Sequence, residues 1–386
     1  MARVVPVDAY RSVVTKTSTS VADGLTLSTE LLQTGAGPER VNLLDVDLAN
    51  AGMCLGVVQA HDQLVSSNET VSSMADRTAA LAGVNGDYFE INGPGRPISM
   101  VVRNGELLQS SAVYPVLGIG SSGKPVIAIP SFSGQVVTDH ASYALKSVNV
   151  YNDTRKGNMV LITPALGASI STKNETVALL WHVADTPGAF TVQSVRRNMA
   201  NLPALSGQFA LVAGGAAGTW LANNLRAGMN LTVTKHVSPD DDLVQAIGGG
   251  PQIVQNGALY NDPHPPAPKN MTARNPLTAV AITKNGTHAL FAVFNGRFAD
   301  TQKSTGLTPA EAAKYMLAHG ASQAMLFDGG GSSEMVARLP GQHQISVINS
   351  PSDGRERPVA NGLFVYKASA GGEGSDHPFC GHKSAV

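Results

Sequence analysis

Three Asn-Gly pairs separate apolar segments of the chain and predict β-hairpins. Each pair follows a run rich in Val, Ile, Ala or Met, residue types that suit buried or half-buried strands. Asn-Gly also supplies the two positive φ values that a type I′ turn requires. We therefore expect hairpins at Asn104-Gly105, Asn256-Gly257 and Asn285-Gly286.

The segment that begins at Thr308 carries three signals of a helix start. Thr308 suits the N-cap, Pro309 suits the first helical position, and Glu311 completes a capping box. An apolar side follows, and Gly320 is a natural helix end. A strand over residues 323–327 is expected directly afterwards.

This order places Asp328 just past the carboxyl end of a strand, where α/β sheets often bind ligands. A second predicted helix, over residues 71–80, leads into an apolar strand over residues 80–84. That strand again ends in polar residues, Asn85-Gly86-Asp87-Tyr88-Phe89. A third helix is expected over residues 218–225.

The many short strands and few helices predict an α+β fold of mixed, strand-rich sheets with several hairpins and a few packed helices. The abundance of glycine (40 residues) supports tight turns between the strands. We expect an N-terminal strand-rich segment over residues 1–75 and a main domain over residues 76–366. The main domain would contain a variable β-rich middle at about 124–237, and a flexible tail would cover residues 367–386.

The charge of the chain argues against a nucleic-acid-binding protein. Only 14% of residues are charged and the formal net charge is −1, whereas phosphate backbones require clustered Lys and Arg.

No apolar run is long enough to predict a membrane span. The first residues lack the apolar core of a signal peptide, so we expect either a cytoplasmic protein or an extracellular one that has lost its leader. Cys54 and Cys380 are compatible with one long-range disulfide or with two free thiols.

The run Asp328-Gly329-Gly330-Gly331-Ser332-Ser333-Glu334 is the first candidate for chemistry. Three consecutive glycines cost backbone entropy, but they suit a place where the backbone approaches a ligand or where N–H groups surround an anion. A carboxylate beside them can act as acid, base or nucleophile. The competing interpretation, a tight turn with a solvated aspartate, has about equal weight when this run is considered alone.

A second candidate is the group Asn85, Asp87 and Tyr88, followed by Gly95-Arg96-Pro97. An amide, a carboxylate and an aromatic ring are groups that hold sugars, although a turn in which Asn and Asp cap backbone groups is the better interpretation in isolation. Gly248-Gly249-Gly250-Pro251 is a further glycine loop, for which a structural turn is the better interpretation in isolation.

Three arginines lie next to polar or glycine-rich motifs: Arg274, Arg297 and Arg357. A guanidinium offers a planar fork that suits phosphate or carboxylate. Most arginines are solvated surface residues, so each one alone is weak evidence for a site. The carboxylates and carbonyls near the glycine loops are also compatible with a divalent cation such as calcium, but no ligand set is defined.

Taken together, these motifs resemble the phosphodiester glycosidase family, in its bacterial form, over roughly residues 40 to 366. Each motif is weak alone, but their order along the chain is specific. The matching motifs are Val84-Asn85-Gly86-Asp87-Tyr88-Phe89, Gly95-Arg96-Pro97, Gly248-Gly249-Gly250-Pro251, Arg274-Asn275-Pro276, Asn295-Gly296-Arg297, Gly306-Leu307-Thr308, Phe327-Asp328-Gly329-Gly330-Gly331-Ser332-Ser333, Asn349-Ser350-Pro351 and Glu356-Arg357-Pro358.

Three positions depart from the family pattern. Asn295 stands where the family often has Asp, and Glu334 stands where Thr is common. Leu326-Phe327 replaces a frequent Asn-Leu. These changes affect the expected substrate more than the expected fold.

The resemblance implies a hydrolase that cleaves an anomeric C–O bond of a sugar, through a transition state flanked by two carboxylates. The expected substrate is a sugar-1-phosphodiester or an exposed glycan or polysaccharide terminus. The expected catalytic residues are Asp328 and Asp87, with Glu334 in reserve. The expected substrate-binding residues are Asn85, Tyr88, Arg96, Gly249, Gly250, Arg274, Asn295, Arg297, Gly329, Gly330, Gly331, Ser332, Ser333, Arg357 and Asn361.

Two alternatives to this function stay open at the level of sequence. One is an ordinary exo-glycosidase that acts on a bacterial cell-wall glycan or exopolysaccharide without phosphate. The other is a non-catalytic carbohydrate-binding surface protein. In each case the partner is a carbohydrate, and an extracellular location is expected.

Overall fold

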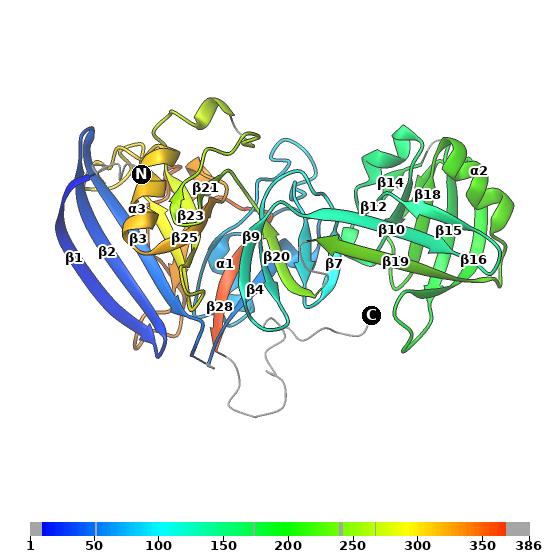
Figure 1. The fold of residues 1–386 in the computed structure, drawn as a ribbon, viewed down its shortest axis with the longest axis horizontal. Helices are drawn as coiled ribbons and strands as arrows, with labels where there is room; N and C mark the ends of the chain where they lie inside the picture. The colour runs from blue at the N-terminus through cyan, green and yellow to red at the C-terminus, as the bar shows by residue number, and fades with distance from the viewer. Residues whose placement is uncertain (1–9, 51, 173, 239–241, 267, 368–386) are drawn as a thin grey trace.

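The computed structural model describes residues 10–50, 52–172, 174–238, 242–266 and 268–367 (Figure 1). Strands account for 46% of the described residues and helices for 13%, which confirms the predicted strand-rich α+β fold. Cys380 and almost all of the predicted tail lie outside the described residues. Among the described helices, none is long and apolar enough to span a membrane.

One eight-stranded sheet combines the N-terminal strands with strands from the last third of the chain (Figure 1). Helix α3 (Pro309–Ala318) packs against one face of it, around the buried side chains of Ala312, Tyr315 and Met316. The spatial order of the strands is β1 (Tyr10–Ala22), β2 (Leu25–Thr34), β3 (Gly37–Asp47), β24 (His288–Phe294), β23 (Leu277–Thr283), β25 (Ala321–Leu326), β21 (Gln252–Gln255) and β22 (Ala258–Leu259).

Two five-stranded sheets occupy the centre of the molecule (Figure 1). The first has the order β27 (Ser346–Val347), β26 (Met335–Ala337), β5 (Ala82–Asn85), β28 (Asn361–Lys367) and β4 (Met53–Gln59), and it contacts helix α1 (Val71–Arg77). The second has the order β7 (Glu106–Gln109), β6 (Val101–Arg103), β20 (Leu243–Gly248), β8 (Val116–Gly120) and β9 (Pro125–Ala128).

The β-rich middle of the chain forms a second eight-stranded sheet at the other end of the molecule (Figure 1). Its order is β11 (Ser142–Leu145), β10 (Ser131–Val137), β19 (Asn230–Ser238), β16 (Ala189–Arg197), β15 (Thr176–His182), β18 (Phe209–Ala213), β13 (Met159–Ile162) and β12 (Ser147–Val148). Helix α2 (Gly215–Asn224) packs on this sheet, and β14 (Ile170–Ser171) pairs with β17 (Asn201–Leu202) beside it. Short 3-10 helices cover Ala60–Asp62, Tyr151–Lys156, Pro164–Leu166, Pro268–Asn270 and Gly330–Ser332.

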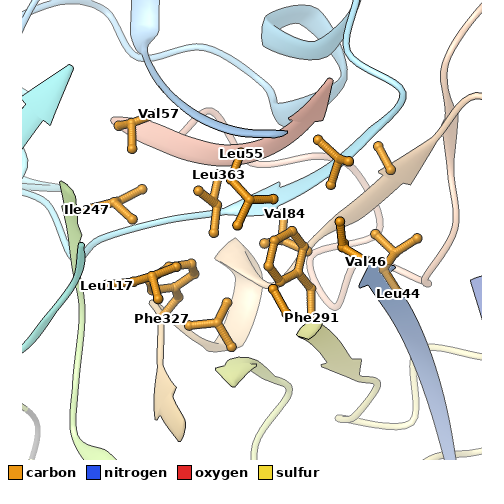
Figure 2. Close-up of a cluster of buried hydrophobic side chains, with 14 of the residues drawn as sticks. Leu44, Val46, Leu55, Val57, Val84, Leu117, Ile247, Phe291, Phe327 and Leu363 are labelled. Atoms are coloured by element: carbon orange, nitrogen blue, oxygen red, sulfur yellow. The ribbon is translucent and has the colours of Figure 1, made fainter. Parts of the chain in front are cut away.

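One apolar core joins the first eight-stranded sheet to the two central sheets. Figure 2 shows Phe291 from β24, Val84 from β5 and Ile247 from β20 in this cluster, with Phe327 beside them. Phe327 is 1% exposed, so its ring anchors the end of β25 in the core. Burying such a ring stabilises the fold by about 1.5–3 kcal/mol, and it fixes the backbone from which Asp328 emerges.

The three predicted hairpins are present, and two of them contain the expected turn. Asn104 and Gly105 have φ values of 51° and 79°, and Asn256 and Gly257 have φ values of 51° and 70°. The Asn285-Gly286 turn differs, because the loop between β23 and β24 extends from residue 284 to 287. Its Gly286 donates a backbone hydrogen bond to Thr283. A longer loop therefore stands where a two-residue turn was predicted.

The helix predicted at Thr308 is confirmed together with its capping box. The Thr308 side chain accepts from the Glu311 N–H, and the Glu311 carboxylate accepts from the Thr308 N–H at 2.9 Å. The other helices differ from expectation at their ends. Helix α1 ends at Arg77, three residues earlier than predicted, and α2 covers Gly215–Asn224.

Candidate active site

Backbone hydrogen bonds place Asp328 beside the segment that follows β5. The Phe327 N–H donates to the Thr278 carbonyl at 2.8 Å, and the Asp328 N–H donates to the Gly86 carbonyl at 2.9 Å. The two polar segments that the sequence placed after separate strands, around Asp87 and around Asp328, therefore meet directly.

Asn85 holds this junction from inside the protein. Its Nδ2 donates to the Asp328 carbonyl at 2.8 Å, and its Oδ1 accepts from Thr278 Oγ1 at 2.7 Å and from the Glu334 N–H at 3.0 Å. The residue is 0% exposed, and these bonds occupy its amide. The geometry gives Asn85 a positioning role, whereas the sequence suggested that it binds substrate.

The glycine loop after Asp328 brings its backbone close to two arginines. A Cβ at Gly331 would lie 2.1 Å from Arg357 Nη2, and a Cβ at Gly330 would lie 2.8 Å from Arg297 Nη2. Gly330 also has a φ of 64°, which glycine adopts without strain. A side chain at Gly331 would therefore displace the Arg357 guanidinium and the Asp353 carboxylate, and the positive φ at Gly330 favours glycine there.

Burial raises the pKa of Asp328 from its ordinary value of 3.8 to about 6. Hydrogen bonds from Ser332 and from the Gly329 N–H, and the positive charge of Arg357, act in the opposite direction but do not cancel the burial effect. Gly329 N lies 2.9 Å from Asp328 Oδ1. Such a carboxyl group changes its protonation state near neutral pH.

Burial also raises the pKa of Asp87, to about 7, and the neighbouring charge of Asp328 adds to this increase. Asp87 is 1% exposed. Its two carboxyl oxygens accept from the Ser99 N–H at 2.6 Å and from Ser99 Oγ at 3.0 Å. The charge of Asp328 therefore acts on Asp87 in addition to the larger effect of burial.

A cavity of about 110 Å³ opens at Asp328. Tyr88 and Arg297 line it together with the aspartate, so that an aromatic ring, a carboxylate and a guanidinium group share one space. Tyr88 Oη donates to the Gly250 carbonyl at 3.1 Å. The remaining lining residues are Pro251, Asn270, Met271, Asn275, Pro276, Leu277, Pro309, Leu326, Phe327, Gly329 and Gly330.

Arg297 is the less constrained of the two arginines at the glycine loop. Its Nη1 lies 3.9 Å from Asp353 Oδ1, and its side chain is 47% exposed. Arg357 is held more closely, because Asp353 Oδ2 accepts from its Nη2 at 2.6 Å and from its Nε at 2.9 Å. Arg357 Nη1 also donates to Ser332 Oγ at 3.3 Å. Arg297 is therefore better placed to bind a ligand anion, and Arg357 to brace the loop.

The described residues contain no group of three or more His, Cys, Asp or Glu side chains arranged to hold a metal ion.

Residues 205–366 match the sequence profile of a family described as phosphodiester glycosidase. This part of the chain is therefore similar to the phosphodiester glycosidase family. The matched region contains Arg297, Asp328 and Arg357, whereas Asp87 and Tyr88 precede it and reach the same site through the fold. No curated protein matches the chain significantly.

Solved structures with a similar fold have low sequence identity. A hypothetical protein from Synechocystis has a TM-score of 0.72 and 18% identity, over 92% of this chain and 64% of that protein. A Burkholderia pseudomallei protein described as "Putative exported protein" has a TM-score of 0.65 and 21% identity, over 86% of this chain and 74% of that one. The zebrafish N-acetylglucosamine-1-phosphodiester α-N-acetylglucosaminidase catalytic domain, auto-inhibited by its pro-peptide, has a TM-score of 0.47 and 14% identity, over 92% and 88%. The chain thus spans slightly less than two thirds of the Synechocystis protein.

Two of the arginines predicted to bind substrate brace the protein instead of lining the cavity. Arg96 is 7% exposed, and it donates to Glu90 Oε1 at 3.0 Å and to the Asn149 carbonyl at 3.1 Å. Arg274 contacts the Glu311 carboxylate and the Gly306 carbonyl at the start of α3. Their charges are therefore engaged by partners within the protein.

Other predicted residues of the site support the loops that border the cavity. Asn295 Nδ2 donates to Asp300 Oδ2 at 2.7 Å, which shapes the turn that carries Arg297. Asn361 Oδ1 accepts from the Asp87 N–H at 2.9 Å. Gly249 and Gly250 donate their N–H groups to Pro115 and Leu326. Gly331, Ser332 and Ser333 lie in the loop but do not line the cavity.

Three residues that the structure brings to the site were not singled out from the sequence. Ser99 holds the Asp87 carboxylate, Asp353 holds Arg357, and Asn275 lines the cavity. Asp353 follows the Asn349-Ser350-Pro351 motif, and Asn275 lies inside the Arg274-Asn275-Pro276 motif. Proximity to these motifs could have identified both residues from the sequence. Ser99 required the tertiary structure.

Proposed function

We propose that this protein is a glycoside hydrolase that cleaves the anomeric C–O bond of a sugar-1-phosphodiester. The observation that carries the proposal is one cavity lined by Asp328, Tyr88 and Arg297. The carboxylate suits a developing positive charge at the anomeric carbon. The ring suits the apolar face of a sugar, and the guanidinium suits the phosphate oxygens. Family membership of residues 205–366 supports the same reaction class.

A phosphate leaving group is weakly basic, so it needs positive charge more than it needs a proton. Arg297 supplies that charge at the cavity wall. In the proposed mechanism, Asp328 acts in its ionised form. Asp87, which is buried next to it, carries a proton. One structural neighbour is described as "Putative exported protein", which supports an extracellular glycan as the substrate.

The substrate class is tested by comparing sugar-1-phosphodiesters with aryl glycosides of the same sugars. We expect kcat/KM to be at least tenfold higher for a phosphodiester, because only its leaving group interacts with Arg297. Hydrolysis of aryl glycosides alone would assign an ordinary exo-glycosidase. Binding of glycans without turnover of either series would assign a carbohydrate-binding protein.

The raised pKa values of Asp328 and Asp87 predict a bell-shaped dependence of kcat/KM on pH. The pKa of Asp328 is raised to about 6 and that of Asp87 to about 7. Below the first value the ionised Asp328 is lost, and above the second value the proton on Asp87 is lost. Activity should therefore peak at pH 6–7. It should fall by up to tenfold per pH unit below pH 6 and above pH 7. A profile that is flat from pH 4 to 9 would contradict this assignment.

A further inference from the structure

One exposed tryptophan lies away from the cavity at Asp328. Trp181 belongs to strand β15, in the sheet formed by the middle of the chain, and it is 45% exposed. That sheet lies at the opposite end of the molecule from the sheet that contains β25, the strand before Asp328 (Figure 1). A single exposed apolar residue is ordinary on a protein surface, so the groups beside the indole ring decide what it can bind.

Trp181 projects from the face of this sheet that helix α2 does not cover. Successive side chains of a strand alternate between the two faces. Leu180 packs with Ala217 and Leu221 of α2 in one buried cluster, whereas Leu179 packs against the cluster on the other face. Trp181 therefore shares the face of Leu179, and its exposure shows that this end of the face is open to solvent.

The strand register places a hydroxyl group and an amide on one side of the ring. Trp181 is directly opposite Thr191 of β16, and Thr191 is directly opposite Asn230 of β19. Directly opposed residues of antiparallel strands present their side chains on the same face. Thr191 Oγ1 donates to Asn230 Oδ1 at 2.9 Å, so the two groups are held together beside the indole.

Two glutamine amides meet on the other side of the ring. Leu180 is opposite Phe209, the first residue of β18, and continuing this register by one residue brings Gln208 opposite Trp181. Gln208 Nε2 donates to Oε1 of Gln193, on β16, at 2.8 Å. Because β16 and β18 are the two neighbours of β15, this hydrogen bond crosses over β15 and fixes both amides next to the tryptophan.

These side chains form a row across four strands, which we call the Trp181 row: Gln208, Trp181, Thr191 and Asn230. With strands about 4.8 Å apart, the row is about 14 Å long. The indole offers a flat apolar face for a sugar ring, and the amide and hydroxyl groups both donate and accept hydrogen bonds, as sugar hydroxyls require. The row carries no formal charge, which matches a neutral ligand. A protein partner would instead require an apolar centre of several residues.

We propose that the Trp181 row is a binding platform for a neutral glycan chain, separate from the cavity at Asp328. On a long glycan, this second contact would raise the effective concentration of the chain near the cavity. The proposal goes beyond the proposed function, because it concerns binding at another surface. Oligosaccharides without phosphate test it, so a failure of the hydrolase reaction leaves it decidable.

The test uses the indole N–H signals of the protein in ¹H–¹⁵N NMR spectra. The chain contains two tryptophans, so W181F assigns both signals. Trp220 packs against the cluster under α2, with its ring 5.4 Å from that of Tyr143, and serves as the internal reference. Maltohexaose, cellohexaose and mannohexaose are the neutral probes, and an oligogalacturonate is the anionic one. We expect a neutral probe to shift the Trp181 signal saturably, with a Kd on the order of 1 mM, and to leave the Trp220 signal unchanged.

Variants of the row should weaken this binding in calorimetric titrations. We expect W181A to raise Kd at least about tenfold, because the stacking surface is lost, and Q208A and T191V to raise it about threefold each. The matched control is L259A, which removes a side chain of similar exposure (47%) from β22 in the other eight-stranded sheet. It should leave Kd unchanged. Thermal unfolding establishes that each variant is folded, and Q208A and T191V decide the test if W181A is not.

Four results would overturn the platform. The first is an unshifted Trp181 signal with every neutral probe at about 10 mM, well above the expected Kd. The second is tighter binding of the oligogalacturonate than of any neutral probe. The third is neutral-glycan binding that persists unchanged in folded W181A, or in Q208A and T191V together. The fourth is a Trp181 signal that follows protein concentration instead of oligosaccharide, which would assign this face to a second copy of the chain.

Discussion

Asp328→Asn should lower kcat about 10³-fold on every substrate that the protein hydrolyses, equivalent to about 4 kcal/mol of transition-state stabilisation. The substitution keeps the shape of the side chain, and the Asn oxygen can still accept from the Gly329 N–H, which lies 2.9 Å from Asp328 Oδ1. The backbone bonds to Gly86 and Asn85 are unaffected. The loss of activity would therefore report the loss of the carboxylate itself.

D328N should lose activity without losing stability against unfolding. The pKa of Asp328 is raised in the folded state, so above pH 6 its ionisation favours unfolding, and the neutral amide removes that effect. We expect D328N to be as stable as wild type or more stable in urea at pH 8, with the exposed-site variant D139N as the control. Near-complete activity in folded D328N would remove Asp328 from the catalytic role.

Arg297→Ala should separate the two classes of substrate. A charge-assisted hydrogen bond to a phosphate oxygen contributes about 1.5–3 kcal/mol, so kcat/KM for a sugar-1-phosphodiester should fall about 10–100-fold. Aryl glycosides carry no charge at that position, and their kcat/KM should change less than about threefold. Steady-state kinetics with both substrate series provides the measurement.

The control for Arg297 is Arg197→Ala, which removes an exposed guanidinium from strand β16, in the sheet formed by the middle of the chain. It should leave both substrate series unchanged. Arg297→Lys should recover part of the phosphodiester activity, because it restores charge without the planar fork. Equal losses on both series in R297A would indicate that Arg297 supports the loop and does not recognise phosphate.

Local features of the fold could be predicted because their causes are local. The capping box at Thr308 depends on two side chains three residues apart, and the turns at Asn104 and Asn256 depend on positive φ values that Asn and Gly adopt. The turn at Asn285 shows the limit of this reasoning. Its sequence suits a two-residue turn, but β23 ends at Thr283 and β24 begins only at His288, so the loop is longer.

The candidate site could be predicted only in part. The motifs at Asp87 and Asp328 identified carboxylates at the ends of buried strands, and the structure joins these ends through the bond from the Asp328 N–H to Gly86. The arginines could not be ranked from the sequence. Arg96 and Arg274 are engaged by Glu90 and Glu311, whereas Arg297 lines the cavity. Glu311 belongs to helix α3, so only the fold shows that it engages Arg274.

The sequence by itself determined the strand-rich class, the capped helix, the hairpin positions and the order of the motifs, because backbone preference and side-chain periodicity act over a few residues. The tertiary structure alone decided which carboxylates share a cavity with an arginine and which do not. Strand β5 pairs with β26 and β28, and this long-range pairing places Asp87 beside Asp328. Burial at these positions then sets the pKa values, since a carboxylate loses its hydration only when the distant segments close over it.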